Sequence, residues 1–221
     1  ADFINNRFDY LFNKSKKSQS YFKPPMKLNA IDIFSNWADS GKDESMAKAH
    51  KPAVFEMLQF IYQSFNNSFS FIDAGCGNGW VVKEIISNSK CSRAIGVDGS
   101  AKMIEKAKSQ DSNGTYFCSD LVEWEPKKKV DIVHSMEVLY YFKKPYKVIK
   151  HIVENWLKPS GLLIIGIDHY IGNPDSYSWS KDLNVHMTLM SESEWKNMLE
   201  KAGLVDCNSW RANQINNSAG T

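Results

Sequence analysis

Three aspartates are the residues of this sequence best placed to bind a ligand, because each one follows a short apolar run. They are Asp73 in FIDAG, Asp98 in AIGVD and Asp120 in YFCSD. After the first of them the glycines are spaced GxGxG, from Gly75 to Gly79. Glycine lets a backbone approach a ligand closely, and an acid at the end of the following strand can accept hydrogen bonds from ribose hydroxyls. The spacing therefore predicts a site for a ribose-bearing ligand.

The glycine loop does not match the two common phosphate-binding patterns. No Gly-Lys-Ser/Thr follows it, which excludes the P-loop. The dinucleotide fingerprint GxGxxG fails by one residue, and the sequence offers no phosphate-binding group near the loop. A NAD-dependent or nucleotide-sugar Rossmann enzyme is therefore the weaker alternative.

The elements that must position these residues alternate along the chain. Short apolar runs and helical patterns follow one another from about residue 69, which is typical of a mostly parallel sheet with helices on both faces. The predicted strands are Ser70 to Ala74, Arg93 to Val97, Thr115 to Ser119, Val130 to Ser135 and Leu162 to Ile167. The three aspartates then lie on one edge of the sheet, where open α/β folds bind ligands.

Helices are predicted between and around the strands. The clearest one, from Tyr146 to Leu157, repeats apolar residues on a single face. A later helix begins at Ser191, whose spacing to Glu194 makes a capping box. Upstream, Pro52 is expected to separate a helix near Asp43 to His50 from the one that leads into the first strand.

Three further segments lie at the ends of this alternation or interrupt it. Residues 1–66 are predicted to form a helical N-terminal lid, and residues 67–221 the ligand-binding core. A long aromatic connection at residues 168–190 reads as a functional loop, because long ordered loops usually have a role. A strand fits Val205 to Arg211.

Composition limits the classes of protein and partner. The chain has 221 residues, of which 43% are hydrophobic and 24% charged, as in a soluble globular domain. The net charge is +2 and the arginines are only Arg7, Arg93 and Arg211, so no nucleic-acid partner is expected. The four cysteines form no metal-binding pattern, and no metal is expected. No apolar stretch suggests a membrane span or signal peptide, so we expect a cytoplasmic protein, monomeric or homodimeric.

Five motifs occur in order at suitable spacing. They are DAGCGNG, GVDGS, the pair Ser119–Asp120, VDIVHSMEVLYY from Val130 to Tyr141, and LKPSGLLII from Leu157 to Ile165. In this order the sequence resembles the class I S-adenosylmethionine-dependent methyltransferases, which have a Rossmann-like fold. The sheet of that family usually finishes with an antiparallel hairpin, so the resemblance implies a final antiparallel strand that is short or missing in this sequence. The resemblance implies S-adenosylmethionine as the methyl donor and S-adenosylhomocysteine as its product. This cofactor has no phosphates, so a loop without a pyrophosphate pattern is no obstacle.

The resemblance also implies a role for each matching position. The cofactor-binding residues would be Asp73, Gly75 and Gly77 at the methionine end, Asp98 at the ribose, Gly99, Met103, Asp120 and Leu121 at the adenine, and Ser135 near the sulfonium.

Catalytic residues are harder to predict. Methyl transfer uses an activated donor, so positioning and desolvation can supply most of the acceleration. A base is useful if the acceptor is a hydroxyl or an ammonium, and the candidates are His134, Glu137 and His169, with His50 and His186 as outside candidates. The tetrad Asp/Asn-Pro-Pro-Tyr, which the resemblance would associate with planar amines of nucleobases or glutamine, is replaced by HSME.

The acceptor pocket is expected among aromatic residues that flank the sheet edge. They are Trp37, Tyr140, Tyr141, Tyr170, Tyr177 and Trp179. The leading hypothesis is methyl transfer to a small molecule by in-line displacement. The alternatives are a non-catalytic regulatory protein that binds the adenosyl cofactor, and a methyltransferase acting on protein or RNA.

Overall fold

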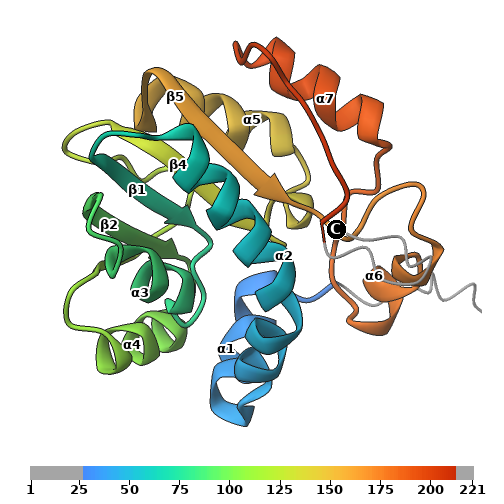
Figure 1. Ribbon diagram of the computed structural model, residues 1–221. Coiled ribbons are helices and arrows are strands. Elements are labelled where there is room, and N and C mark those ends of the chain that lie inside the picture. Colours follow the sequence, from blue (N-terminus) through green and yellow to red (C-terminus); the bar gives the residue numbers. More distant parts are fainter. Residues whose placement is uncertain (1–26, 213–221) are drawn as a thin grey trace, which may run out of the picture.

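A computed structural model describes residues 27–212 and shows a five-stranded sheet whose strands all run parallel (Figure 1). The strand order is β3-β2-β1-β4-β5. The strands are β1 Phe69–Ala74, β2 Cys91–Asp98, β3 Thr115–Cys118, β4 Val130–Met136 and β5 Leu157–Gly166. The predicted α/β fold with a parallel sheet is confirmed, and within residues 27–212 every named strand is in this one sheet.

Helices connect the strands and precede them. They are α1 Ala30–Ser40, α2 Lys42–Ser64, α3 Trp80–Ile86, α4 Ala101–Gln110, α5 Pro145–His151, α6 Trp179–Asp182 and α7 Glu192–Lys201. Short 3-10 turns cover Leu139–Tyr141 and Pro174–Ser176, and a π-helical turn covers Ile152–Trp156. The predicted capping box of Ser191 with Glu194 is present, and Ser100 caps the N-terminus of α4. No described helix is long and apolar enough to cross a membrane.

The core has two apolar layers, one on each face of the sheet. Helices α2, α3 and α4 supply Val54, Leu58, Val82 and Ile104 to one layer. Helices α5 and α7 and the π turn supply the other, in which Trp156 is fully buried. Figure 1 shows α2 in front of the sheet and α5 behind it. All six residues of β1 are buried, as expected for a central parallel strand.

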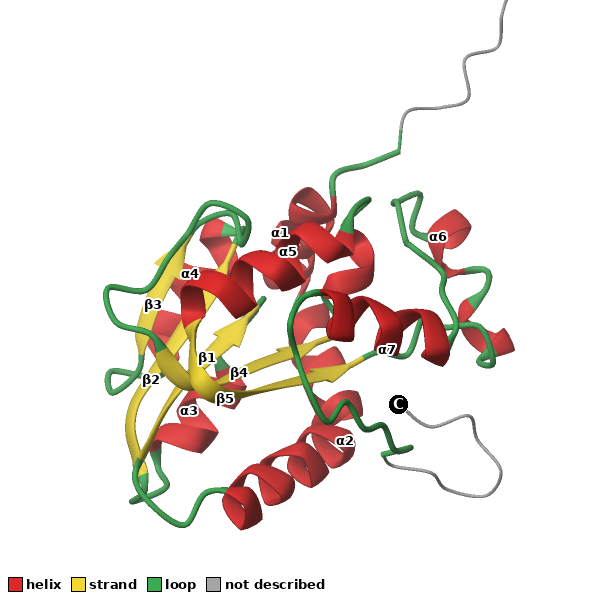
Figure 2. Ribbon diagram, turned by 90° about the horizontal axis from the view of Figure 1, so that it is seen from above, coloured by secondary structure: helices red, strands yellow, loops and turns green. Residues whose placement is uncertain are grey.

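The register of the strands brings the ligand-binding candidates to one edge. Asp73 of β1 pairs with Gly96 of β2 and with His134 of β4, and Asp98 is the last residue of β2. Figure 2 shows β4 and β5 pointing toward the side of the molecule that holds α6. The carboxyl ends of the central strands therefore face the 168–190 segment.

Two predictions of secondary structure are wrong. Pro52 does not separate two helices, because α2 is continuous from Lys42 to Ser64. Proline removes one backbone hydrogen bond from a helix interior, but burial of Val54 and Leu58 on the sheet holds the helix together. Residues 205–211 form no strand and instead run as an irregular segment after α7.

Other predictions shift or fall outside the described residues. The predicted helix from Tyr146 to Leu157 ends in a π turn, and β5 already begins at Leu157, which pairs with Val130. Residues 1–26 of the predicted lid and any strand after Ala212 lie outside the described part of the chain. The division into a lid of residues 1–66 and a core of residues 67–221 stays a prediction.

Candidate functional site

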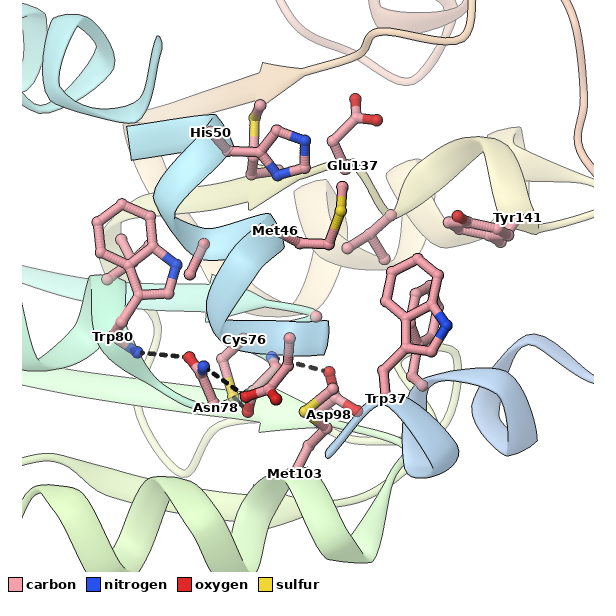
Figure 3. Close-up of a pocket in the computed structure, with 18 of the residues that line it drawn as sticks. Trp37, Met46, His50, Cys76, Asn78, Trp80, Asp98, Met103, Glu137 and Tyr141 are labelled. Carbon is pink, nitrogen blue, oxygen red and sulfur yellow. Dashed lines mark hydrogen bonds between the residues drawn. The ribbon is translucent and has the colours of Figure 1, made fainter. Parts of the chain in front are cut away.

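A cavity of about 350 Å³ opens at the carboxyl ends of β1, β2 and β4 (Figure 3). This volume is in the range of small-molecule sites. Its floor is the glycine loop, and its walls come from α1, α2, the turn after β4, and α6. Of the predicted cofactor residues, Asp73, Gly75, Gly77, Asp98 and Met103 line it.

The glycine loop is shaped by positive φ angles. Gly75 has φ of 80°, and a Cβ added there would lie 2.3 Å from a methyl carbon of Val138, so a side chain is excluded. Gly77 has φ of 51°, but an added Cβ would meet no heavy atom within 4 Å. The first glycine is thus required by packing, whereas the second leaves open space beside the cavity.

Asp98 is oriented by the backbone on both sides of it. The Gly77 N–H donates to Asp98 Oδ2 at 2.9 Å, and the Ser100 N–H donates to Oδ1 at 2.8 Å. Burial raises the pKa of Asp98, and these two hydrogen bonds oppose the shift. The carboxylate is therefore rigidly held, and it has no cationic side chain among its hydrogen-bond partners in the described chain.

Asp73 and His134 form a buried pair across β1 and β4. His134 Nδ1 lies 2.7 Å from Asp73 Oδ1, and both side chains are nearly inaccessible to solvent. The His134 ring stacks on Phe71. Its Nε2 is buried and, among the described residues, has no hydrogen-bond partner. This geometry orients Asp73, so His134 is positioned to act through that carboxylate.

Glu137 directly follows β4 and carries a strained backbone. Its φ is 59°, which is uncommon for a residue with a side chain. The carboxylate accepts a hydrogen bond from Tyr140 Oη at 2.7 Å and another from the Asp168 N–H. Burial and the charge of Asp168 raise the pKa of Glu137 well above its ordinary value. Strained residues held by their surroundings are often part of functional sites.

His50 of α2 completes a cluster with Glu137 and Asp168. Its Nε2 lies 3.8 Å from Asp168 Oδ2, and burial lowers the pKa of the imidazole while Asp168 opposes the shift. One ligand atom from each of the three residues lies within 4.8 Å of the others. These donor types could hold a metal ion, and the expectation of a metal-free protein stays a prediction.

His169, the third predicted catalytic residue, does not line the cavity. It is buried, its Nδ1 lies 3.0 Å from the Ser176 carbonyl oxygen, and its ring stacks on Trp179. Burial lowers its pKa. In this arrangement His169 supports Trp179, which does reach the cavity.

Some of the predicted aromatic residues line the cavity and others do not. Trp37, Tyr140, Tyr141 and Trp179 line the cavity, whereas Tyr170 and Tyr177 lie outside it. Phe34 of α1, which the sequence did not single out, packs edge-on against both Trp37 and Tyr141.

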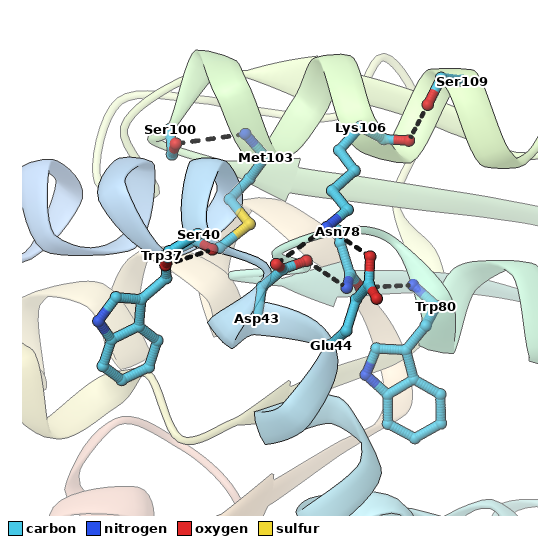
Figure 4. A network of polar contacts seen from close by, with 10 residues as sticks. All are labelled: Trp37, Ser40, Asp43, Glu44, Asn78, Trp80, Ser100, Met103, Lys106 and Ser109. Atoms are coloured by element: carbon cyan, nitrogen blue, oxygen red, sulfur yellow. Dashed lines mark hydrogen bonds and ion pairs between the residues drawn. The ribbon is translucent and has the colours of Figure 1, made fainter.

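A polar network ties α2 to the glycine loop and to α4 (Figure 4). Buried Asp43 accepts from Asn78 Nδ2 at 2.7 Å and from Lys106 Nζ at 2.9 Å. Lys106 also pairs with Glu44 at 2.8 Å. This network holds the first turn of α2 against the rim of the cavity.

The remaining predicted cofactor residues do not line the cavity. They are Gly99, Asp120, Leu121 and Ser135. Gly99 packs against Ile31 of α1, and Ser135 Oγ donates to the Ala74 carbonyl oxygen at 2.8 Å. Asp120 is exposed and caps its own turn by accepting from the Val122 N–H. Their roles in binding the adenine and the sulfonium stay predictions.

Sequence reasoning gave too little weight to the contribution of α2. Met46, Ala47 and His50 line the cavity from one face of this helix, and Trp80 does so from the start of α3. The helical spacing of Met46 and His50 was a usable signal, but only the position of α2 over the sheet edge turns that face into a wall.

An all-parallel sheet with a glycine loop after β1 and an acid at the end of β2 defines a Rossmann-like fold. Residues 43–207 match the family described as the methyltransferase domain. The protein therefore belongs to this family of methyltransferase domains, and its fold is the Rossmann-like fold of the class I methyltransferases.

Similar proteins support this assignment. Trans-aconitate 2-methyltransferase of Escherichia coli O1:K1 is 27% identical over 162 residues, which are 73% of this chain and 58% of that protein. Among solved structures, a chain of the complex between the Haloferax volcanii Trm112 methyltransferase activator and a methyltransferase gives a TM-score of 0.69 at 24% identity, covering 79% of this chain and 82% of that one. The DhpI complex with SAH gives 0.60 at 18% identity, covering 78% and 85%.

Proposed function

We propose that this protein transfers a methyl group from S-adenosylmethionine to a small-molecule acceptor bound in the same cavity. The position of Asp98 is the observation that supports this best. Its carboxylate ends β2, lines the cavity and is held by the Gly77 and Ser100 amides. An acid in this place can accept hydrogen bonds from both hydroxyls of a ribose.

The side chains around Asp98 fit the other parts of the donor. The two backbone hydrogen bonds leave each Asp98 oxygen with a further lone pair for a ribose hydroxyl. The open space beside Gly77 allows close approach of the methionine end. Met103 offers a polarizable apolar surface for the adenine.

The donor supplies a methyl group already activated on a sulfonium. The protein then has to hold the acceptor in line and exclude water. The aromatic side chains Trp37, Tyr141 and Trp179 surround the cavity and suit this task. The acceptor named for the E. coli relative is not transferred to this chain, because the chain spans 58% of that protein at 27% identity.

Ligand binding tests the proposal directly. We expect S-adenosylmethionine and S-adenosylhomocysteine to raise the melting temperature, by mass action on the folded state, and NAD and ATP to leave it unchanged. Stabilisation by NAD but by neither sulfur compound would overturn the proposal. Release of S-adenosylhomocysteine with a screened acceptor then distinguishes a methyltransferase from a regulatory protein.

Substitution of Asp98 tests its role in holding the ribose. Asp98→Ala is expected to weaken binding of S-adenosylhomocysteine by about 1–3 kcal/mol, because hydrogen bonds to a charged group are lost. Isothermal titration calorimetry measures the change, with exposed Asp175→Ala as the matched control. Unchanged affinity in a folded Asp98 variant would remove this residue from the ribose site.

A further inference from the structure

We propose that the end of the cavity next to His50, Glu137 and Asp168 binds the ammonium group of a small amine, and that this amine is the methyl acceptor. The inference rests on the proposed function, because it names the acceptor class of the same site. Four observations carry it: the charges around the cavity, the lack of basic partners for two carboxylates, the aromatic walls and the position of His50.

Most of the charged side chains that line the cavity are acidic. Five of them are carboxylates, namely Asp43, Asp73, Asp98, Glu137 and Asp182. The one lysine, Lys42, lies with its Nζ 4.2 Å from the centre of the Trp37 ring, and no described arginine lines the cavity. Electrostatic complementarity therefore favours a cationic acceptor over an anionic one.

The acids near the glycine loop already have partners. Asp43 pairs with Lys106, Asp73 contacts His134, and Asp98 accepts from two backbone amides.

Glu137 and Asp168 differ from those acids. Within residues 27–212 neither forms a salt bridge with a lysine or arginine, and the nearest basic group is the His50 imidazole, 3.8 Å from Asp168. Two adjacent carboxylates without a strong cation repel each other, which is one reason that the pKa of Glu137 is raised. An ammonium group placed between them would offset this repulsion.

Aromatic faces complete the subsite. Tyr140 and Tyr141 follow Glu137 in the same turn, after Val138 and Leu139, and their ring centroids are 4.5 Å apart. Trp179 reaches the cavity from α6. Rings of this kind attract ammonium groups through their negative faces. In Figure 3, Met46 and His50 point from α2 toward Glu137, so the subsite lies between α2 and the turn after β4.

His50 is placed to take the proton that an amine must lose before it attacks. The imidazole lines the cavity from α2, close to Glu137, and a neutral imidazole can accept a proton from an ammonium group bound there. Its Nε2 lies 3.8 Å from Asp168 Oδ2, which is beyond hydrogen-bond distance. In the step, the ammonium gives one proton to His50, the nitrogen lone pair forms the N–CH₃ bond, and the C–S electron pair returns to sulfur, leaving a methylammonium product.

Matched probes test the acceptor class by binding, independently of turnover. The probes share a framework and differ only in the terminal group: phenethylamine, phenethyl alcohol and hydrocinnamate, then butylamine, butanol and valerate. Dissociation constants are measured by calorimetry with and without S-adenosylhomocysteine, in EDTA to keep the cluster free of metal. At least one amine is expected to bind about tenfold or more tightly than its matched alcohol and acid, as hydrogen bonds to charged groups contribute about 1.5–3 kcal/mol.

Variants then assign the preference to the subsite. Glu137→Gln and Asp168→Asn should each remove the tenfold preference for the amine, whereas Glu105→Gln on the exposed face of α4 should keep it. His50→Gln should keep amine binding but lower the rate of transfer about a hundredfold, the usual size of a general-base contribution.

The outcomes separate this inference from the proposed function. If neither amine binds more tightly than its matched alcohol and acid, or if both carboxylate variants keep the preference, the amine subsite is wrong. If S-adenosylhomocysteine fails to bind while an amine still does, the proposed donor is wrong and the amine subsite stands.

Discussion

Glu137 unites three features that are costly for a folded protein. It has a positive φ, its carboxylate lies partly buried, and Asp168 places a second negative charge beside it. Each feature destabilises the folded state by itself, and proteins retain destabilising features mainly where a functional site needs them. The stability of the fold should therefore respond to this side chain in a pH-dependent way.

Glu137→Gln should stabilise the protein at neutral pH and lose that advantage in acid. The folded-state pKa of Glu137 is raised above its ordinary value of 4.5, so the folded protein holds a proton that the unfolded chain releases. Above about pH 4.5, stability then falls as pH rises, by up to about 1.4 kcal/mol per pH unit until the raised pKa is reached. Glutamine cannot ionise in either state, so the variant escapes this loss.

Urea unfolding of both proteins between pH 4 and pH 8 measures the difference. The gap in unfolding free energy should open with increasing pH, and it should narrow when a cationic amine is bound. Glu105→Gln serves as the control, because Glu105 is exposed. A gap of constant size across this range would show that Glu137 has an ordinary pKa.

Helix α2 connects the fold to the site. Its second half packs on the sheet through Val54 and Leu58, and its first turn is tied to the glycine loop by Asp43. The middle of the helix presents Met46 and His50 to the cavity. The cavity wall therefore depends on the contacts that hold both ends of this helix.

Lys106→Met should cost more stability than Lys102→Met, although both lysines are on α4 and both pair with an acid of the N-terminal helices. Lys106 and Asp43 have side chains only 18% and 3% exposed, so removing the lysine leaves a buried carboxylate with Asn78 alone. A loss of about 1–3 kcal/mol is expected for such a group. Lys102 and Asp39 are 50% and 57% exposed, and a pair of that kind contributes about 0–1 kcal/mol.

Thermal and urea unfolding at low and high salt compare the two variants. The loss for Lys106→Met should persist at high salt, since buried pairs are weakly screened. Equal losses in the two variants would mean that the network around Asp43 does not anchor α2.

Much of the molecule could be predicted from the sequence, for identifiable reasons. Strand ends at Asp73 and Asp98, with glycines between, follow from local patterns that parallel sheets repeat. The continuity of α2 through Pro52 could not be predicted, because burial on the sheet overrides a local helix breaker. The approach of His50 to Asp168 depends on how α2 crosses the sheet edge, and these residues lie far apart in the sequence.

The segment after α7 shows the opposite case, in which the local sequence pattern predicts a strand that the structure does not form. Residues 205–211 have a strand-like composition, but in the structure they pair with no strand. Together with residues of β5, they instead line a second cavity of about 310 Å³. Trp210 contacts Phe60 of α2, and Arg211 contacts both Glu192 and the Tyr170 ring. Side-chain contacts, without a backbone ladder, hold this part of the chain.

Hydrogen exchange should therefore divide the molecule into regions of very different protection. Within residues 27–212, the last amide with a backbone hydrogen bond is that of Leu204, so amides 205–212 should exchange through local opening, well before the sheet unfolds. The amides of β1 lie between β2 and β4 in a fully buried strand and should exchange only on global unfolding.

S-adenosylhomocysteine should slow exchange in the glycine loop and the first half of α2, and leave residues 205–212 unchanged. Mass-spectrometric exchange with and without the ligand tests this map, and protection of 205–212 equal to that of β1 would show that the segment is part of the cooperative core.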